Sequence, residues 1–304
     1  MVTNPSFGIK HAFVTGATGI VGVPLCRELV AAGVRVTAFS RNAGEYGFPE
    51  EVEHQLGDIL DIDSLHIAAA DADAVFHVAA AVHGSAESYE DFKKMNIDGT
   101  ENVIRLTRNL GAKLVHVSSV NVEGFLDGDL VDAYAATKSR AEELVVEAVA
   151  NGLEAVIVRP ATVFGNEAGR AGLLVDRLFS GSLKILPAPS RMISPVWSHD
   201  LAKALIRAGS IGTSGQVYTV AGDPMSTGAF VNAVCESGGL RKPWLSIPGI
   251  LFAIPLQVAW WLRGVSRWTP SVSVESLLTG SNHDGSEAAK ELGFEYTPIC
   301  QIFD

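Results

Sequence analysis

A nine-residue segment near the start of the chain, V-T-G-A-T-G-I-V-G at residues 14–22, constrains the fold more than any other feature. It follows a short apolar run and precedes a stretch with helical periodicity, so its three glycines lie in a strand-to-helix turn. Gly16 permits a tight turn, Gly19 leaves the backbone open to a ligand, and Gly22 lets the helix pack against the strand. The N–H groups at the start of the helix favour a phosphate. The candidate phosphate-binding residues are Gly16, Ala17, Thr18, Gly19, Ile20, Val21 and Gly22.

The first half of the chain alternates apolar runs with amphipathic stretches. The runs are rich in Val, Ala and Ile without strict alternation, which is typical of strands buried on both faces. They are His11–Thr15, Arg35–Ser40, Ala74–Val78, Leu114–Ser118 and Ala155–Arg159, and a further run, third along the chain, ends before Gly57. The helical stretches between them are Ile20–Ala32, Ser64–Ala70, Phe92–Asn109 and Ala133–Ala150. This order predicts an α/β fold with a doubly wound parallel sheet.

The pattern changes after Pro160. Residues 166–191 are interrupted by Gly and Pro around one helical stretch, Leu173–Phe179, whereas residues 193–220 resume the alternation of strand and helix. Residues 221–304 are interrupted repeatedly by proline. We therefore expect a smaller, irregular lobe built from separate segments. The predicted division assigns residues 1–165 and 192–220 to the binding domain and residues 166–191 and 221–304 to the substrate lobe.

Composition excludes several classes of protein. The net charge is −11, from 23 basic and 34 acidic residues, so a nucleic acid is not expected as a partner. Cys26, Cys235 and Cys300 are few, odd in number and far apart, which argues against a disulfide framework and against a metal site. Residues 1–10 have no apolar core of signal-peptide length, so we expect a cytoplasmic protein.

Tyr134 and Lys138 are the strongest candidates for chemistry. They stand four residues apart within the helical stretch 133–150, so both side chains reach one site. A free tyrosine has a pKa of about 10, too high for proton exchange near neutrality. Because a nearby ammonium group favours the phenolate, we expect Lys138 to lower the pKa of Tyr134.

The glycine spacing G-x-x-G-x-x-G and the spacing Y-x-x-x-K together resemble the extended short-chain dehydrogenase/reductase family, within the NAD-dependent epimerase/dehydratase superfamily. The resemblance continues to the closing segment Asp284–Phe294. It implies a Rossmann-type dinucleotide-binding domain, a C-terminal substrate lobe and an NAD(P)-dependent oxidoreductase. Within the superfamily the chain is most similar to hydroxysteroid dehydrogenase-like and dihydroflavonol reductase-like members.

The resemblance assigns further catalytic roles. Residues 118–124 are similar to the family's S-S-x-x-V-Y-G segment, which makes Ser119 the donor that hydrogen-bonds the substrate oxygen, with Ser118 as the alternative. Asn96, in N-I-D-G-T, would support the active-site helix and a water relay. Lys138 would also hydrogen-bond the nicotinamide ribose. Where the family has the tyrosine of V-Y-G, this chain has Glu123.

The resemblance also implies cofactor contacts beyond the glycine turn. Asp58, followed by Ile59, would contact adenine, and the small residues after the fourth strand would keep the dinucleotide close to the sheet. The backbone of an R-P-x-x-V segment after the sixth strand would contact the nicotinamide amide. Asp200 is interpreted as structural. The added cofactor candidates are Asp58, Ile59, Ala79, Ala80, Ala81, Tyr134, Lys138, Pro160 and Val163.

The end of the second strand bears on the choice between NAD and NADP. An NAD-binding protein usually places an acidic residue there for the ribose 2′-hydroxyl. Here the strand ends in F-S-R-N, and Arg41 can meet a 2′-phosphate with two parallel hydrogen bonds. We therefore expect NADP, with NAD as the alternative.

Three reaction classes compete within the family. Dehydratases place an acid pair directly after the catalytic serine or threonine, whereas this chain has Val120 and Asn121, so dehydration is disfavoured. Nucleotide-sugar epimerases usually have a longer segment between the serine and the tyrosine. We therefore favour the interconversion of an alcohol and a ketone on a lipophilic small molecule. An epimerase and a non-catalytic NADP-sensing regulator stay open as alternatives.

Residues 247–262, I-P-G-I-L-F-A-I-P-L-Q-V-A-W-W-L, contribute to the high mean hydropathy of +0.23. The segment is too short and too interrupted by proline to span a membrane, which takes about 20 apolar residues. Its interpretations are the core of the lobe, a homodimer face, or an apolar pocket or membrane-surface entrance for a lipophilic substrate.

Overall fold

The computed structural model describes residues 8–82, 85–86, 88–126, 132–166, 172–251, 280 and 282–303. Seven parallel strands form one central sheet in the order β11-β6-β5-β4-β1-β2-β3. This is the predicted Rossmann-type doubly wound sheet, with the strand order reversing between β1 and β4. The strands are β1 (His11–Thr15), β2 (Arg35–Ser40), β3 (Val52–Leu56), β4 (Ala74–His77), β5 (Lys113–Val117), β6 (Ala155–Pro160) and β11 (Val217–Val220).

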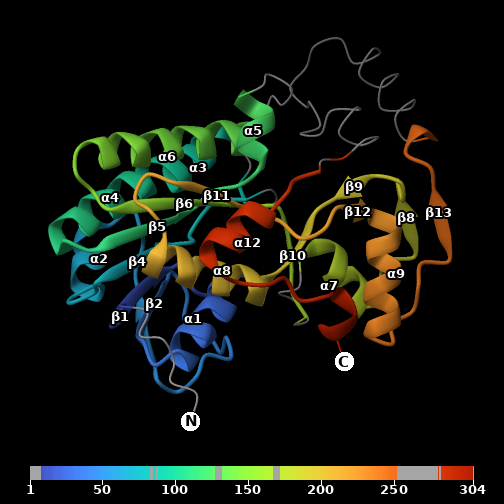
Figure 1. Cartoon of the computed structure of the whole chain (residues 1–304), viewed down its shortest axis with the longest axis horizontal. Helices are drawn as coiled ribbons and strands as arrows, with labels where there is room; N and C mark the ends of the chain where they lie inside the picture. Colours follow the sequence, from blue (N-terminus) through green and yellow to red (C-terminus); the bar gives the residue numbers. More distant parts are fainter. Residues whose placement is uncertain are drawn as a thin grey trace.

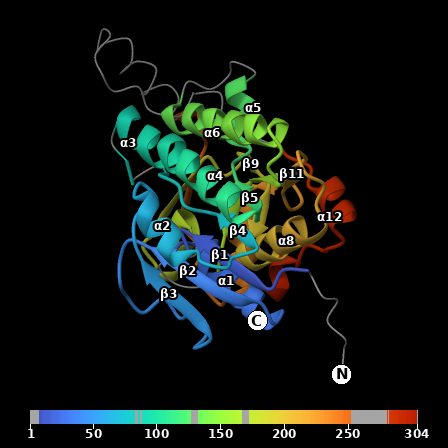
Figure 2. The ribbon, with the colours of Figure 1, turned by 90° about the vertical axis from the view of Figure 1, so that its left-hand side faces the viewer.

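Helices cover both faces of the sheet, as Figures 1 and 2 show. On one face α1 (Gly22–Ala31) and α8 (Ser198–Ile211) pack on side chains such as Val14, Phe76 and Val156. On the other face α2 (Ile62–Ala68), α4 (Gly99–Leu110) and α6 (Ala133–Ala150) pack on a second cluster that includes Phe13. Burial on both faces explains why most strands are apolar throughout. The exception is β3, a polar edge strand with half-buried or exposed residues.

The helix boundaries follow local chemistry. Asp61 caps α2 by accepting from the backbone N–H groups of Asp63 and Ser64, and Asp132 caps α6 in the same way. The expected helix Phe92–Asn109 is interrupted, because α3 (Tyr89–Lys93) continues into a π-helical turn at Lys94–Asp98 before α4 begins. Such turns occur often at functional sites.

A smaller lobe lies beside the sheet, at the right of Figure 1. Its hydrophobic cluster joins Val175 and Leu178 of α7 with Phe230 and Val234 of α9, and it includes Phe164 from β7. Three two-stranded pairs complete this part: β10 with β7, β12 with β9, and β13 with β8. The elements are β7 (Thr162–Phe164), α7 (Leu173–Phe179), β8 (Ile185–Pro187), β9 (Met192–Ile193), β10 (Pro195–Trp197), β12 (Met225–Ser226), α9 (Thr227–Ser237) and β13 (Leu245–Ile247).

The C-terminal segment returns to the sheet-bearing part. There α12 (Ser286–Leu292) packs on α8 and β11, and a 3₁₀ turn at Ile299–Gln301 packs on α9. Asp200 anchors this segment, because its buried carboxylate accepts from the backbone N of Thr297 at 2.6 Å and from its hydroxyl at 2.8 Å. These contacts agree with the structural interpretation of Asp200.

Two expectations extend beyond these observations. The residue boundaries of the binding domain and the substrate lobe stay a prediction. The strand β7 falls inside the first predicted domain, but it pairs with β10 and contributes Phe164 to the core of the lobe. Of residues 247–262, only 247–251 belong to the described part; the rest of that prediction lies outside the described residues. No helix within the described ranges is long and apolar enough to cross a membrane.

Candidate active site

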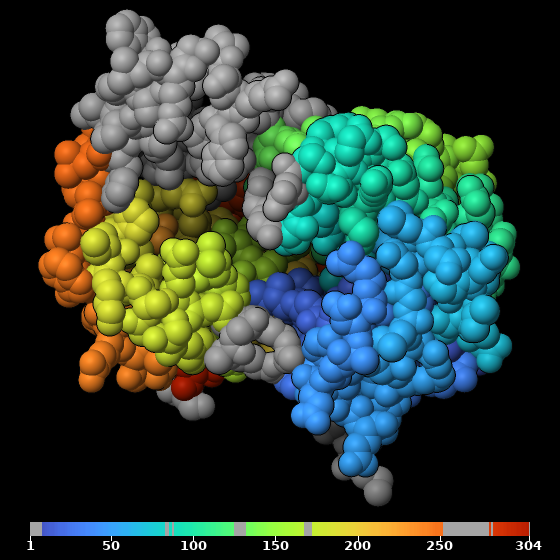
Figure 3. Space-filling model, turned by 180° about the vertical axis from the view of Figure 1, so that it is seen from behind, coloured from blue at the N-terminus to red at the C-terminus, as the bar shows by residue number. Residues whose placement is uncertain are grey.

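A cavity of about 490 Å³ lies at the carboxyl ends of the parallel strands, where the strand order reverses between β1 and β4. Ligands of open α/β sheets bind at this point because the loops on either side diverge. In Figure 3 a recess opens between the blue and teal residues of the sheet-bearing part and the yellow residues of the smaller lobe. The cavity extends from the glycine turn to Ser119, Tyr134 and Lys138.

The glycine turn has the geometry that the sequence predicts. Gly16 has a φ of +66°, and a Cβ there would lie 2.6 Å from the backbone N of Ala79, so β1 and β4 approach too closely for a side chain. A Cβ on Gly22 would overlap the backbone of Gly16 and Ala17. Gly19 differs, because its nearest neighbour would be 3.4 Å away. Packing therefore does not require glycine at that position, and a missing side chain there would let a ligand approach the backbone from the cavity.

The start of α1 faces the same cavity. Its N-cap, Val21, offers no side-chain hydrogen bond, and the first turn of the helix contains no acidic residue. Backbone N–H groups and the positive end of the helix dipole are therefore available to an anion. Gly16, Gly19, Ile20 and Val21 all line the cavity, so the turn and the helix fit the pyrophosphate of a dinucleotide.

The ends of β2 and β3 form another wall of the cavity, with Phe39, Ser40, Arg41 and Asp58 among its residues. The Ser40 hydroxyl donates to the carbonyl of Asn42 at 3.1 Å. One Asp58 carboxylate oxygen accepts from the backbone N of Leu60 at 3.0 Å. The exposed Arg41 is the cation of this wall.

Asn96 links two segments by hydrogen bonds behind the cavity. Its amide exchanges two hydrogen bonds with the backbone of Ala81, at 2.8 and 3.2 Å, and donates to the Thr137 hydroxyl of α6 at 3.0 Å. The side chain lies in the π-helical turn and is buried. Asn96 therefore joins the segment after β4 to the helix that carries Tyr134 and Lys138. Its predicted part in catalysis stays a prediction.

Tyr134, Ser119 and Lys138 meet at one end of the cavity. Tyr134 stands in the first turn of α6, which Asp132 caps by accepting from the Tyr134 backbone N at 3.1 Å. The Tyr134 phenol and the Ser119 hydroxyl are hydrogen-bonded. Lys138 is 2% exposed, and its ammonium donates to the carbonyl of Val117 at 2.7 Å. Ser118 also lines the cavity, but its hydroxyl makes no hydrogen bond within the described ranges.

The pKa of Tyr134 corrects one expectation. The sequence predicts that Lys138 lowers it, but burial raises the pKa of this phenol above 10, against the lowering effect of the Ser119 hydrogen bond, and the charge of Asp132 raises it further. The physical reason is desolvation, which disfavours the phenolate. The Lys138 ammonium is buried and donates to the carbonyl of Val117. The protein alone therefore keeps Tyr134 protonated, as a proton donor.

The pKa of Lys138 is lowered to about 8, because burial disfavours the ammonium form and the Glu142 carboxylate compensates only in part. Two buried histidines adjoin this lysine. Burial and then the charge of Lys138 lower the pKa of His77 to about 3 and the pKa of His116 well below its usual range. Both imidazoles are therefore neutral, and near neutral pH Lys138 is the cation of this cluster.

His77 belongs to a chain of buried hydrogen bonds under the cavity. The Thr100 hydroxyl donates to the Asn96 carbonyl at 2.6 Å, so the His77 Nε2–H donates to Thr100 Oγ1 at 3.0 Å. His77 Nδ1 then accepts from the Thr15 hydroxyl at 2.9 Å. The chain links the ends of β1 and β4 to the π-helical turn, so the backbone that forms the floor of the cavity is held from below.

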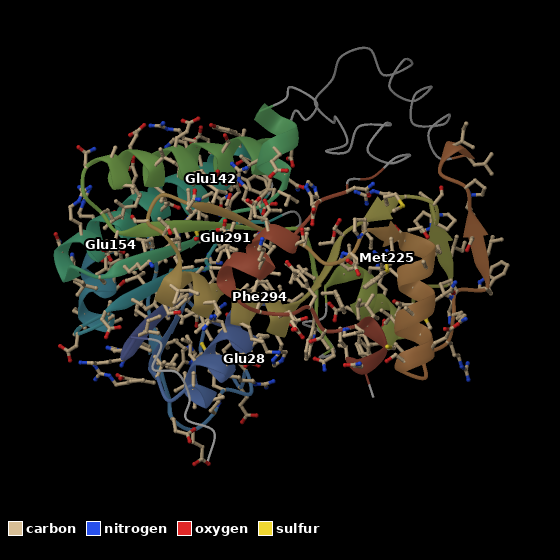
Figure 4. The ribbon with its side chains drawn as sticks, in the orientation of Figure 1. Glu28, Glu142, Glu154, Met225, Glu291 and Phe294 are labelled. Carbon is tan, nitrogen blue, oxygen red and sulfur yellow. The ribbon has the colours of Figure 1, made fainter. Side chains whose placement is uncertain are left out.

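Glu123, the departure from the family's V-Y-G, belongs to an ionic network. Arg159 of β6 donates to Glu142 through Nε at 2.9 Å and through Nη2 at 2.7 Å, and to Glu123 at 3.3 Å. Glu123 also lies 3.2 Å from Nδ1 of His283 in the C-terminal segment. Figure 4 labels Glu142 on α6, one helical turn beyond Lys138. The network connects α5 (Asn121–Leu126), which follows Ser119, to the sheet and to the C-terminal segment.

Most of the predicted residues line the cavity. They are Gly16, Thr18, Gly19, Ile20, Val21, Arg41, Asp58, Ile59, Ala79, Ala80, Ser119, Tyr134, Lys138, Pro160 and Val163. Four predicted residues do not: Ala17 and Gly22 are buried behind the turn, and Ala81 and Asn96 bond to each other behind the wall.

Ser118, the predicted alternative to Ser119, also lines the cavity. The sequence did not indicate eight further lining residues, which are Phe39, Ser40, Gly57, Val78, Val82, Met95, Val117 and Ala161. All of them except Phe39 adjoin a predicted residue along the chain, so extending each motif by one position would have found them. Phe39 lies two residues before Arg41 and carries no such signal. Within the described part of the chain, no group of three or more His, Cys, Asp or Glu residues is arranged to hold a metal ion.

The sequence over residues 12–221 matches the NAD dependent epimerase/dehydratase family. The chain belongs to this family and is an NAD(P)-dependent oxidoreductase of the extended short-chain dehydrogenase/reductase type. The 2-alkyl-3-oxoalkanoate reductase of Shewanella oneidensis is 28% identical over 97% of this chain and 84% of the relative. The 3 beta-hydroxysteroid dehydrogenase/Delta 5-->4-isomerase of Mycobacterium tuberculosis is 27% identical over 94% of this chain and 86% of the relative.

A solved structure shares the fold of this chain. The crystal structure of gox2253 has a TM-score of 0.80 to this chain at 25% identity, and the match covers 97% of this chain and 96% of that one. The similarity therefore includes the smaller lobe as well as the sheet.

The buried ammonium of Lys138 makes a testable contribution to stability. Its pKa of about 8 in the folded protein lies below the value of about 10.4 of an unfolded lysine. Between these values the unfolded state binds more protons, so the free energy of unfolding rises with pH. The unfolding free energy of wild type minus that of Lys138→Met should increase from pH 8 to pH 10, because only wild type has this lysine. The increase should be at most about 1.4 kcal/mol for each pH unit.

Urea unfolding of both proteins at several pH values measures this difference. The control, Lys290→Met, removes an exposed lysine of α12 and should leave the pH dependence of the wild type unaltered. A difference between wild type and Lys138→Met that stays constant from pH 8 to pH 10 would show that Lys138 is not a buried cation.

Proposed function

We propose that this protein reduces a ketone on a lipophilic small molecule to an alcohol, or catalyses the reverse reaction, with NADP as the preferred cofactor. One observation carries the proposal: a single cavity joins the glycine turn to the hydrogen-bonded pair Ser119 and Tyr134 and to the ammonium of Lys138. A dinucleotide held at the turn would have room to extend toward these three residues.

The fit of a dinucleotide rests on the backbone. Gly19 lacks a side chain at a position where packing does not require glycine, and α1 presents its N-terminus without a capping side chain. These residues would hold the pyrophosphate. Lys138, Tyr134, Pro160 and Val163 stand elsewhere along the same cavity and would hold the nicotinamide half. When bound, the cofactor supplies or accepts the hydride.

The protein's own residues would move the proton. Burial keeps Tyr134 protonated, and its hydrogen bond to Ser119 orients the phenol. In the reduction, the Tyr134 hydroxyl would donate its proton to the carbonyl oxygen while the Ser119 hydroxyl hydrogen-bonds the same oxygen. Lys138, a cation near neutral pH, would favour the phenolate that remains.

The lining residues support a lipophilic substrate. Apart from the glycine turn and the ends of β2 and β3, the cavity includes Val82, Met95, Val117 and Ala161, which are all apolar. No lysine or arginine other than Lys138 and Arg41 lines it within the described residues, and a sugar nucleotide would bring a second pyrophosphate. The two relatives named above act on a 2-alkyl-3-oxoalkanoate and on a 3 beta-hydroxysteroid, as their names state.

The wall that contains Arg41 supports NADP. Arg41 lines the cavity at the end of β2, and the terminal residue of that strand, Ser40, is not acidic. A guanidinium at this place can form two parallel hydrogen bonds with a 2′-phosphate. Asp58, the acidic residue of this wall, already accepts from the backbone of Leu60.

Replacing the proposed proton donor tests the reaction. Tyr134→Phe should lower the turnover number for NADPH oxidation by about 10²- to 10⁴-fold, because general-acid catalysis typically contributes that much. The substrate panel comprises 2-alkyl-3-oxoalkanoates, ketosteroids and, as the competing class, sugar nucleotides. The affinity for NADPH, measured by fluorescence titration, should change only a few-fold.

The control for this experiment is Tyr218→Phe, which removes a hydroxyl that accepts from the backbone N of Thr213 at 3.0 Å, on β11 and outside the cavity lining. It should retain turnover. If Tyr134→Phe turned over substrate as fast as wild type, the assigned role of Tyr134 would be wrong.

Replacing Arg41 tests the cofactor preference. Arg41→Gln should weaken binding of NADPH by about tenfold or more, because a hydrogen bond to a charged group contributes about 1.5–3 kcal/mol. Binding of NADH should change less than about twofold, since NADH lacks the 2′-phosphate. Arg108→Gln, in the last turn of α4, is the matched control. Equal losses for both nucleotides, measured by isothermal titration calorimetry, would contradict the preference for NADP.

A further inference from the structure

The outer edge of the smaller lobe exposes large apolar side chains. There β13 pairs with β8 in parallel, with Leu245 opposite Ile185, and a turn continues from β13 into residues 248–251. The exposed fractions are 73% for Trp244, 58% for Ile250, 57% for Leu251, 40% for Ile185 and 38% for Leu245. We call these five residues the apolar edge. Figure 1 shows β13 at the margin of the molecule, on the far side of β8 and α9 from the central sheet.

The fold of the lobe does not require these side chains to be apolar. Leu186 of β8 points into the hydrophobic cluster of the lobe and is 4% exposed, whereas its neighbour Ile185 is on the opposite face of the strand. Leu245, paired with Ile185, shares that outward face. Scattered single exposed residues need no explanation, but five large exposed apolar side chains on one short strand pair and the turn after it indicate an interaction surface.

Positive charge surrounds the same edge. Lys184 precedes Ile185, and its carbonyl accepts from the backbone N of Trp244 at 3.1 Å, so the lysine and the tryptophan are neighbours in space. Arg241 and Lys242 precede Trp244 and are exposed. Glu236 offsets part of this charge, because its carboxylate lies 2.6 Å from the Lys242 ammonium. The whole chain has a net charge of −11, whereas the three cations Lys184, Arg241 and Lys242 lie close to Trp244 in the sequence or in space.

This combination matches the surface of an anionic lipid bilayer. Tryptophan and aliphatic side chains partition into the interface between headgroups and acyl chains, and lysine and arginine attract anionic headgroups from the water side. A second copy of this chain matches less well, because a two-fold contact would bring the same three cations face to face. The flanking residues Pro243 and Pro248 also disfavour the addition of another strand to β13.

We propose that the apolar edge docks this protein peripherally on anionic membranes, with Trp244, Ile250 and Leu251 entering the interface and Lys184 and Arg241 contacting headgroups. The proposal is independent of the proposed reaction, because it rests on the surface of the lobe alone. If the substrate is lipophilic, docking would place the lobe at the phase into which such a molecule partitions.

Co-sedimentation of the full chain with sucrose-loaded vesicles tests the proposal. Wild type should bind vesicles of phosphatidylcholine with phosphatidylglycerol more strongly than vesicles of phosphatidylcholine alone, and added salt should weaken the binding. The double substitution Trp244→Ser with Ile250→Ser should lower the partition coefficient by about tenfold or more, since two large apolar side chains no longer leave water. Lys184→Glu with Arg241→Glu should abolish the preference for the anionic lipid.

Ile67→Ser is the matched control, because Ile67 of α2 is 81% exposed and lies in the sheet-bearing part. It should bind vesicles like wild type, and a thermal melt should show that every variant folds. The proposal is overturned if wild type stays in solution with both kinds of vesicle, or if the Trp244 and Ile250 variant binds as well as wild type. It is also overturned if sedimentation equilibrium shows a wild-type dimer that this variant dissociates, which would make a second copy the occupant.

Discussion

The proposed active site depends on one buried cation, the ammonium of Lys138. Lys138 is enclosed between α6 and the carboxyl end of β5, where the carbonyl of Val117 accepts its hydrogen bond at 2.7 Å. An ammonium in such a place is costly to desolvate, and its lowered pKa records that cost. The surroundings are arranged to tolerate the charge: His77 and His116 stay neutral beside it, and Glu142 lies one helical turn further along α6. In the proposed reaction this charge would favour the phenolate that remains after Tyr134 has donated its proton.

Because the cation is buried, the elements around it must be held accurately. Arg159 binds Glu142 with two short hydrogen bonds, so the helix and β6 are joined beside Lys138. Asn96 joins α6 to the segment after β4, and the chain through Thr15, His77 and Thr100 holds that segment to β1. The walls of the cavity are therefore connected by hydrogen bonds beneath its floor, and the glycine turn rests on the same strands.

The fold and most of the site could be predicted from the sequence because they rest on local patterns. Gly16 and Gly22 are required by contacts within one turn and with β4, and Tyr134 and Lys138 share a helix face by spacing alone. The sequence does not predict the π-helical turn at Lys94–Asp98, because Phe92–Asn109 has an uninterrupted apolar period. The pattern of strands buried on both faces does not describe β3, because β3 is a polar edge strand. The spacing also places a lysine near Tyr134, but it does not show how deeply the tyrosine is buried. Burial decides the direction in which the pKa of Tyr134 shifts. Glu123 could not be explained because its partners, Arg159 and His283, come from distant segments.

The central claim is that one dinucleotide spans the cavity from the glycine turn to Lys138. A crystal structure of the protein soaked with NADP tests it most directly. Electron density is expected for the pyrophosphate against the backbone of residues 16–22, with the nicotinamide ribose in contact with Lys138 and Tyr134. Density for the nucleotide outside this cavity, or a nicotinamide end turned away from Tyr134, would contradict it.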